Sequence, residues 1–245
     1  MSERKVLFIV EGERCEPRLL RRMHDVLFGT TPGNIHWHGT VVYDLLRRVF
    51  EDGDADDLDV VSVLRETVSD PGRREVLEQE FTDVYLVFDM DPHDPRYDGE
   101  LLDRAMGLFA ESTENGKLYI NYPMLESYRH LRCHDDLGYL DRTVSVESLS
   151  GYKSLVDREG HPDFRQLGRY DEAVFAEVIR MNVMKANRVL NDERSLPDVG
   201  TFLSWRGSDI LDAQIAIMAA ENRVYVLNTS VLYPVEFSPS RFLGK

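Results

Sequence analysis

Acidic side chains gather after one strongly apolar segment of the sequence. Residues 84–88 read Val-Tyr-Leu-Val-Phe, and Asp89, Asp91 and Asp94 follow them closely. Such a run is typical of a strand buried on both faces, as in a parallel sheet covered by helices. Carboxylates crowded at its end repel one another unless they take up protons or bind a hard cation such as Mg²⁺. The alternative is an acidic surface loop after a core strand.

A second apolar strand also ends in acid, near the N-terminus. Residues 5–10 are apolar after the first lysine, Glu11 and a glycine follow, and Pro17 suits the first turn of a helix. The carboxyl ends of parallel strands meet at one edge of a sheet, where α/β proteins bind ligands. We therefore expect Glu11 to lie beside Asp89 and Asp91, although they are far apart in the sequence.

The two motifs together resemble the Toprim domain of topoisomerases, primases and OLD-type nucleases, in which one strand runs into Glu-Gly and a later strand ends in Asp-x-Asp. Residues 11–17, Glu-Gly-Glu-Arg-Cys-Glu-Pro, are most similar to the Glu-Gly-Glu-x-Thr-Glu-Pro start of the RloB-like Toprim proteins of bacterial defence systems, with Cys15 in place of Thr. The resemblance covers about residues 5–130. It implies an α/β fold with a Toprim-like (Rossmann-like), mostly parallel sheet, and a Mg²⁺-dependent endonuclease acting on RNA or DNA in anti-phage defence.

Five carboxylates form the expected metal site. One or two Mg²⁺ or Mn²⁺ ions would be held by Glu11, Asp89, Asp91 and either Glu16 or Glu126. Of these, Glu11, Asp89 and Asp91 are expected to be catalytic. Glu126 follows the strand expected at 117–122 and should reach the same sheet edge. Its alternative role is that of an acid in the first turn of a helix, which favours the helix dipole.

Basic residues near the motifs are candidates for substrate contacts. Lys153 could stabilise charge on a phosphoryl group, Arg14 and Arg18 follow the first motif, and Arg129 follows the fourth strand. Each could equally be a solvated surface residue. The formal charge of −15 argues against a long non-specific nucleic-acid track, which normally needs a basic stripe. A short or structured nucleic acid held by metals and a few arginines remains compatible with it.

Two other functions stay open. A catalytically inactive Toprim-like module would bind metal or a partner protein without cutting, and the acidic surface and Cys15 favour it. A nucleotidyl transferase would consume nucleoside triphosphate. The P-loop, dinucleotide, serine hydrolase and zincin motifs are absent from the sequence. A separate ATPase partner is implied by the resemblance, and a homo-oligomer is left open.

The composition is typical of a globular protein. The 245 residues are 42% hydrophobic, enough for a large α/β domain with a helical insertion. No apolar run approaches the ~20 residues that span a bilayer, and the N-terminus leads into a strand rather than a signal peptide. The two cysteines, Cys15 and Cys133, do not make a disulfide framework, so we expect a cytoplasmic protein without membrane contact.

Three regions are expected along the chain. Residues 1–142 would form the α/β core, 143–207 a helical insertion or cap, and 208–245 would complete the core. This last region begins with a helix at 208–222 that is apolar nearly all round and should therefore be buried, and continues with a last core strand at 223–227.

Some shorter patterns are also informative. Residues 60–64 are expected to form a strand, and the acidic residues 51–59 a solvated loop that lacks the spacing of a calcium loop. His36 and His38 would point to one side of a strand, but no third ligand is near. The segment 130–134, His-Leu-Arg-Cys-His, lacks a second ligand pair, so neither group is expected to bind zinc.

Overall fold

A five-stranded sheet forms the centre of the molecule, in the order β2-β1-β3-β5-β4. The computed structural model describes residues 5–31, 33–51 and 59–244, so most of the acidic loop expected at 51–59 lies outside the described residues. The strands are β1 (Val6–Val10), β2 (Asn34–Trp37), β3 (Asp83–Asp89), β4 (Ala110–Glu111) and β5 (Gly116–Asn121). β1 pairs in parallel with β2 and β3, and β3 with β5, whereas β4 is antiparallel. The expectation of an α/β fold with a mostly parallel sheet is confirmed.

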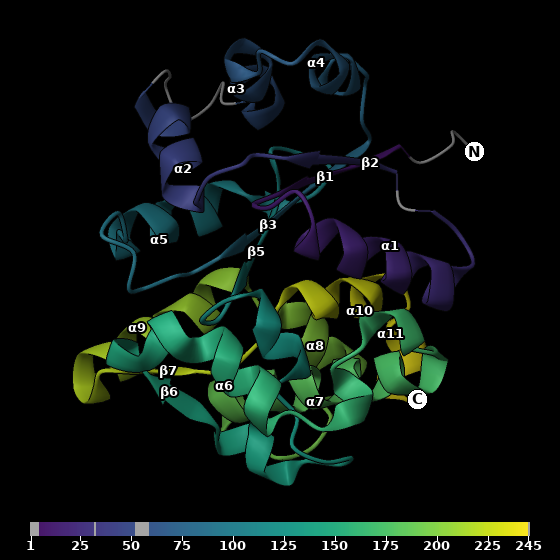
Figure 1. Cartoon of the computed structure of the whole chain (residues 1–245), viewed down its shortest axis with the longest axis vertical. Helices are drawn as coiled ribbons and strands as arrows, with labels where there is room; N and C mark the ends of the chain where they lie inside the picture. Colours follow the sequence, from purple (N-terminus) through teal and green to yellow (C-terminus); the bar gives the residue numbers. More distant parts are fainter. Residues whose placement is uncertain (1–4, 32, 52–58, 245) are drawn as a thin grey trace.

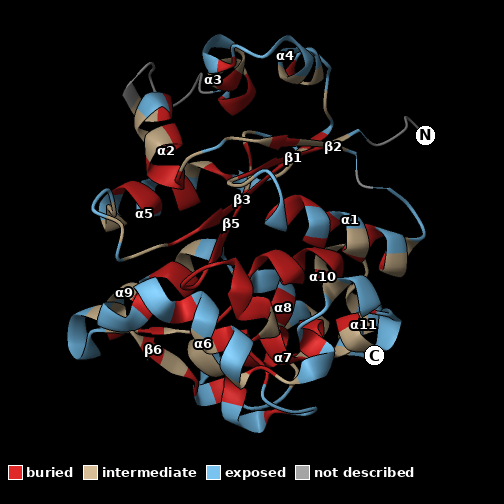
Figure 2. Ribbon diagram, viewed as in Figure 1, coloured by how far each residue is buried: buried red, intermediate tan, exposed pale blue. Residues whose placement is uncertain are grey.

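Both faces of this sheet are covered, as the apolar strands require. The helices of the first half are α1 (Cys15–Phe28), α2 (Val42–Glu51), α3 (Val60–Thr67), α4 (Pro71–Leu77) and α5 (Gly99–Leu108). Leu7 and Ile9 pack with α2, α3 and α5, while Phe8 and Val10 pack with α1 and the C-terminal third. Figure 1 shows α2 to α5 on one side of the sheet and α1 on the other, and Figure 2 shows the strands buried between them.

One expected strand is wrong, and three short strands were missed. Residues 60–64 begin α3, because the Asp59 side chain caps this helix by accepting a hydrogen bond from the Val61 amide at 2.9 Å. A short apolar run fits a helix as well as a strand, so the cap decides. The missed strands are β2, β4 and a strand at Thr143–Ser145, each of which is only two to four residues long and so lacks a recognisable pattern.

The C-terminal third forms a mainly helical body against the second face of the sheet (Figure 1). Its helices are α6 (Tyr152–Glu159), α7 (Glu172–Asn191), α8 (Val199–Ser204), α9 (Gly207–Glu221), α10 (Tyr233–Phe237) and α11 (Pro239–Leu243). α10 returns to the central sheet, where Tyr233 packs edge-on against Tyr85 of β3 at 4.9 Å between ring centroids.

Two expectations for the last region need correction. The strand at 223–227 does not join the central sheet: β7 (Arg223–Tyr225) pairs with β6 (Thr143–Ser145) in a separate antiparallel ribbon, and a single bridge joins Tyr122 to Leu227. α9 is buried on one face only, because alanines occupy much of its outer face and are small enough to be left in water. None of the described helices combines the length and apolar character needed to cross a membrane.

Gly116, at the start of β5, tests the packing of the sheet edge. Its φ is +113°, and a Cβ there would lie 2.8 Å from Leu86 Cδ1 of β3. We expect Gly116→Ala to lower the free energy of unfolding by about 1–3 kcal/mol, measured by chemical denaturation. Gly107 of α5 is the control, because a Cβ there meets no atom within 4 Å. Gly107→Ala should leave stability unchanged or raise it by up to about 1 kcal/mol. Equal effects of the two substitutions would contradict this packing.

Candidate functional site

A cavity of about 580 Å³ lies at the carboxyl edge of β1 and β3, and it is called the acidic cavity below. Its ionisable lining includes Glu11, Glu16, Asp89, Asp91 and Lys153. The carboxylates come from two strand ends and from α1, and the lysine comes from α6 in the C-terminal third. The sequence prediction that distant acids meet at one sheet edge is confirmed for these residues.

Strand register positions the first two carboxylates. Val10 pairs with Val87, so Glu11 and Asp89 leave neighbouring strands at nearly the same level. The Asp89 amide donates a hydrogen bond of 3.4 Å to Glu11 Oε2. Parallel pairing therefore fixes the proximity of Glu11 and Asp89.

Asn121 holds Asp89 from the other side and was not recognised in the sequence. It is the last residue of β5, it pairs in register with Asp89, and its Nδ2 donates to Asp89 Oδ1 at 3.3 Å. Its own Oδ1 accepts a hydrogen bond from the Ser230 amide at 3.3 Å. A fully buried amide thus connects the candidate site to the C-terminal segment.

A strained turn presents Asp91 to the cavity. Asp91 has φ of +41°, in the left-handed region that non-glycine residues rarely adopt, and its amide donates to Pro123 O at 3.1 Å. Its Oδ1 is buried without a hydrogen-bond partner, and His93 Nδ1 lies 4.0 Å away. Asp94, by contrast, does not face the cavity lining, because its Oδ1 forms an ion pair with Arg96 Nε at 2.9 Å.

Gly12 allows Glu16 to enter the cavity. A Cβ at position 12 would lie 2.9 Å from Glu16 Oε2, so a larger residue there would push the end of this flexible side chain aside. Glu16 is the second residue of α1 and is 7% exposed. The glycine therefore leaves room for a fourth carboxylate in its observed position.

Glu126 and Lys153 meet at the border of the acidic cavity. Glu126 lies on a 3₁₀ turn, Leu125–Arg129, rather than on the α-helix expected there. Its Oε1 is 3.6 Å from Lys153 Nζ, whereas its buried Oε2 has no hydrogen-bond partner. Lys153 is thus the cation that the C-terminal third contributes to the site.

Burial makes the carboxylates of the cavity hard to ionise. It raises the pKa of Glu11 to about 8, with further contributions from Asp91 and Glu16. The pKa of Asp89 is raised well above its ordinary value, first by burial and then by Glu11 and Asp91. Burial likewise raises the pKa of Asp91 and of Glu16. The cavity therefore favours uptake of protons or of a cation.

The donor set fits a hard divalent cation. All the acidic groups offer oxygen, which Mg²⁺ and Mn²⁺ prefer, and the orphaned oxygens of Asp91 and Glu126 are free to bind. Among the described residues, however, the acidic cavity does not bring three carboxylate oxygens within 4.8 Å of one another. A cation must therefore draw these side chains together by rotamer changes.

The predicted arginines are not equally placed. Arg14 lines the acidic cavity. Arg18 lines a separate groove on the outside of α1, and Arg129 is held by Asp157 at 2.7 Å. Only Arg14 of the three is positioned at the acidic cavity itself.

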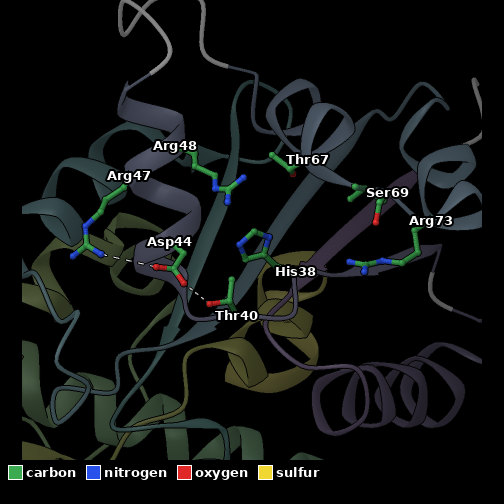
Figure 3. Close-up of a pocket in the computed structure, with 9 residues that line it drawn as sticks. His38, Thr40, Asp44, Arg47, Arg48, Thr67, Ser69 and Arg73 are labelled. Atoms are coloured by element: carbon green, nitrogen blue, oxygen red, sulfur yellow. Dashed lines mark hydrogen bonds and ion pairs between the residues drawn. The ribbon is translucent and has the colours of Figure 1, made fainter.

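A second cavity, of about 430 Å³, gathers arginines and is called the basic pocket below. Its polar lining is His38, Asp44, Arg47, Arg48, Ser69 and Arg73, together with two threonines. Figure 3 shows Arg48 and Arg73 extending toward His38 from opposite sides, while Arg47 turns toward Asp44. The group was not predicted from the sequence, because its members come from the segment after β2, from α2, from the end of α3 and from α4, and they share no motif.

The pKa of His38 is lowered by burial and by the arginines of the basic pocket. Burial lowers its pKa to about 4, and the guanidinium charges of Arg48 and Arg73 lower it further, against the opposing charge of Asp44. His38 is therefore neutral near pH 7, and its buried Nε2 has no hydrogen-bond partner. Such a pocket suits an anion, because an anion would offset the arginine charges and pair with the imidazole.

A third cavity, of about 490 Å³, connects the other two along the sheet edge. It shares Glu11 and Glu13 with the acidic cavity and Thr40 with the basic pocket. The acidic and basic regions are therefore neighbours at the carboxyl edge of β1 and β2.

The pKa of Glu11 predicts the pH dependence of stability without metal. The unfolded chain releases this proton near pH 4.5 and the folded chain near 8, so the folded state loses stability as pH rises between these values. In metal-free buffer at about pH 8.5, the free energy of unfolding of Glu11→Gln should exceed that of the wild type by on the order of 1–3 kcal/mol. At about pH 5 the two free energies of unfolding should differ little. Denaturation at both pH values measures this. Glu13→Gln, an exposed change in the same loop, should follow the wild type. If the stability of Glu11→Gln and of the wild type changed equally between the two pH values, the raised pKa of Glu11 would be contradicted.

Comparisons of this chain with protein-family models, with curated proteins and with solved structures find no match. The description of the fold and of the three cavities therefore rests on the structure of this chain alone. The function proposed next rests on that geometry and on the resemblance carried by residues 11–17 and by Asp89 and Asp91.

Proposed function

We propose that this protein is a divalent-metal-dependent phosphodiester hydrolase of the Toprim type, which cleaves RNA or DNA. The observation that carries the proposal is the acidic cavity, where five carboxylates from different segments gather with raised pKa values or unpartnered oxygens. Maintaining so many buried acids opposes folding, so they are expected where a cation is bound. The resemblance to RloB-like proteins further suggests a role in anti-phage defence beside a separate ATPase.

Each residue of the cavity has a distinct proposed task. A bound Mg²⁺ or Mn²⁺ would supply an activated water and stabilise charge on the phosphate. Glu11 and Asp89 would hold it from adjacent strand ends, with Asn121 fixing the orientation of Asp89. Lys153, which is largely exposed, would offset negative charge on the scissile phosphate from the opposite wall.

The basic pocket is proposed to hold a phosphate of the substrate next to the cleaved one. A nucleic acid is a chain of phosphates, and the third cavity, which is lined by both Glu11 and Thr40, lies between the other two. Arg48 is the best placed contact, because among the described residues it has no hydrogen bond or ion pair and points into the pocket (Figure 3). This arrangement explains how a chain of charge −15 could bind a polyanion locally.

Cleavage assays test the acidic cavity. Pools of DNA, tRNA and messenger RNA are incubated with the protein and Mg²⁺ or Mn²⁺. Glu11→Gln and Asp89→Asn should each lose activity by more than the roughly 10–100-fold typical of changes outside the ligand shell. Asp94→Asn is the matched control, because Arg96 already pairs with this acid outside the acidic cavity, and this variant should cleave like the wild type.

Three results would overturn the proposal of a hydrolase. Equal cleavage by wild type, Glu11→Gln and Asp89→Asn would assign the activity to a contaminant or to another site. Metal binding without cleavage of any nucleic acid would instead support an inactive Toprim-like module. Consumption of nucleoside triphosphate would point to nucleotidyl transfer.

Binding assays test the basic pocket separately from cleavage. In a Glu11→Gln background, Arg48→Ala should weaken nucleic-acid binding for all sequences and reduce the slope of log affinity against log salt by about 1. Fluorescence anisotropy over a range of salt concentrations measures both. Arg206→Ala is the control, because this arginine is 77% exposed and lies at the start of α9. Unchanged affinity and slope in Arg48→Ala would remove the basic pocket from the substrate path without touching the acidic cavity.

A further inference from the structure

A cluster of histidines and acids lies in the C-terminal half, on segments that the sequence does not place together. His134 follows the 3₁₀ turn that carries Glu126, His161 and Asp163 begin another 3₁₀ turn, and Glu177 lies on α7. One ligand atom from each of His134, His161 and Asp163 lies within 4.8 Å of the other two. Among the described residues, this is the group of three metal-ligating side chains that comes closest together.

We propose that His134, His161 and Asp163 form a binding site for a transition-metal ion such as Zn²⁺, with Glu177 orienting His134. Two of the distances already approach the geometry of such a site. Asp163 Oδ2 lies 2.9 Å from His134 Nε2 and 3.6 Å from His161 Nδ1. The ligand atoms of a tetrahedral zinc are about 3.3 Å apart, because the zinc bonds are near 2.1 Å.

Glu177 provides the arrangement that metal-binding histidines use. Glu177 Oε2 lies 2.5 Å from His134 Nδ1, which leaves Nε2 directed at Asp163. Glu177 is itself fixed, because its Oε1 accepts a hydrogen bond from the Asp135 amide at 2.7 Å and its side chain is 15% exposed. A carboxylate on the second nitrogen sets the tautomer and ring orientation of a ligand histidine.

The rings of the two histidines are also supported by packing. His134 and His161 stand edge to face at 5.1 Å between centroids, and both pack on Phe164, which is fully buried. The same groups without a metal form a charge network in which His134 is protonated between two acids. His161 Nδ1 also accepts a long hydrogen bond of 3.4 Å from the Asp163 amide, which caps the 3₁₀ turn, so a bound metal would take the place of this contact.

The ligand chemistry separates this site from the acidic cavity. Two imidazoles and one carboxylate suit Zn²⁺, Ni²⁺ or Co²⁺, whereas an all-oxygen cavity suits Mg²⁺ or Mn²⁺. The exposure of His134 and Asp163, 48% and 55%, leaves a further position for water. The metal would link the segment after Glu126 to the 3₁₀ turn Pro162–Phe164, with α7 attached only through Glu177, and so would stiffen one wall of the C-terminal third.

Zinc binding by the full chain tests this inference independently of hydrolysis. The Glu11→Gln, Asp89→Asn double variant is stripped with chelator and titrated with Zn²⁺ in excess Mg²⁺ by calorimetry. We expect one Zn²⁺ per chain and a rise in melting temperature. His134→Ala and His161→Ala should abolish both effects, and Glu177→Gln should weaken binding by roughly 10–100-fold while keeping all three ligands.

Matched controls decide where the zinc binds. Cys133→Ser removes the thiol beside His134, and His93→Ala removes the histidine of the acidic cavity, and both should bind zinc like the parent. Circular dichroism confirms that each variant is folded. Failure of the parent to bind Zn²⁺, or retained binding in His134→Ala and His161→Ala, would overturn the site. Loss of binding in Cys133→Ser alone would also overturn it in favour of a thiolate site.

Discussion

Repulsion among buried carboxylates at the ends of β1 and β3 is the constraint on which the candidate site depends. Parallel pairing brings Glu11 and Asp89 together whether or not a counter-charge is present, and the packed sheet prevents them from moving into water. The fold therefore holds an electrostatic strain at one edge. A divalent cation would relieve that repulsion, which is why we propose metal-dependent chemistry at this edge of the sheet.

Positive and negative side chains are gathered in separate places on the molecule. An acidic cavity and a basic pocket lie side by side along one sheet edge, within a protein of net charge −15. Recognition of a polyanion at such an edge depends on the charges near the binding site rather than on the net charge. At His38 the nearby charges of Arg48 and Arg73 lower the pKa, although the whole molecule is negative. The cluster of His134, His161 and Asp163 adds a second kind of cation preference in a separate part of the fold.

Sequence patterns predicted the parts of this structure that are local or strongly periodic. The strands that lead to Glu11 and Asp89 follow from two apolar runs. Asn121 and the arginines of the basic pocket could not be predicted, because an isolated polar residue acquires its role only when tertiary packing places it beside another segment. The strand expected at 60–64 was wrong since one capping aspartate outweighs a short apolar run.

The hydrogen bond from Ser230 to Asn121 has a consequence for the order of folding. Asp89 is oriented by Asn121, Asn121 is held by Ser230, and the hydroxyl of the neighbouring Thr229 donates to Ile120 O at 2.8 Å. During synthesis, the first 130 residues carry all five strands of the central sheet but lack the backbone amide that holds this asparagine. A nascent chain therefore acquires its finished acidic cavity only after nearly all of it has left the ribosome.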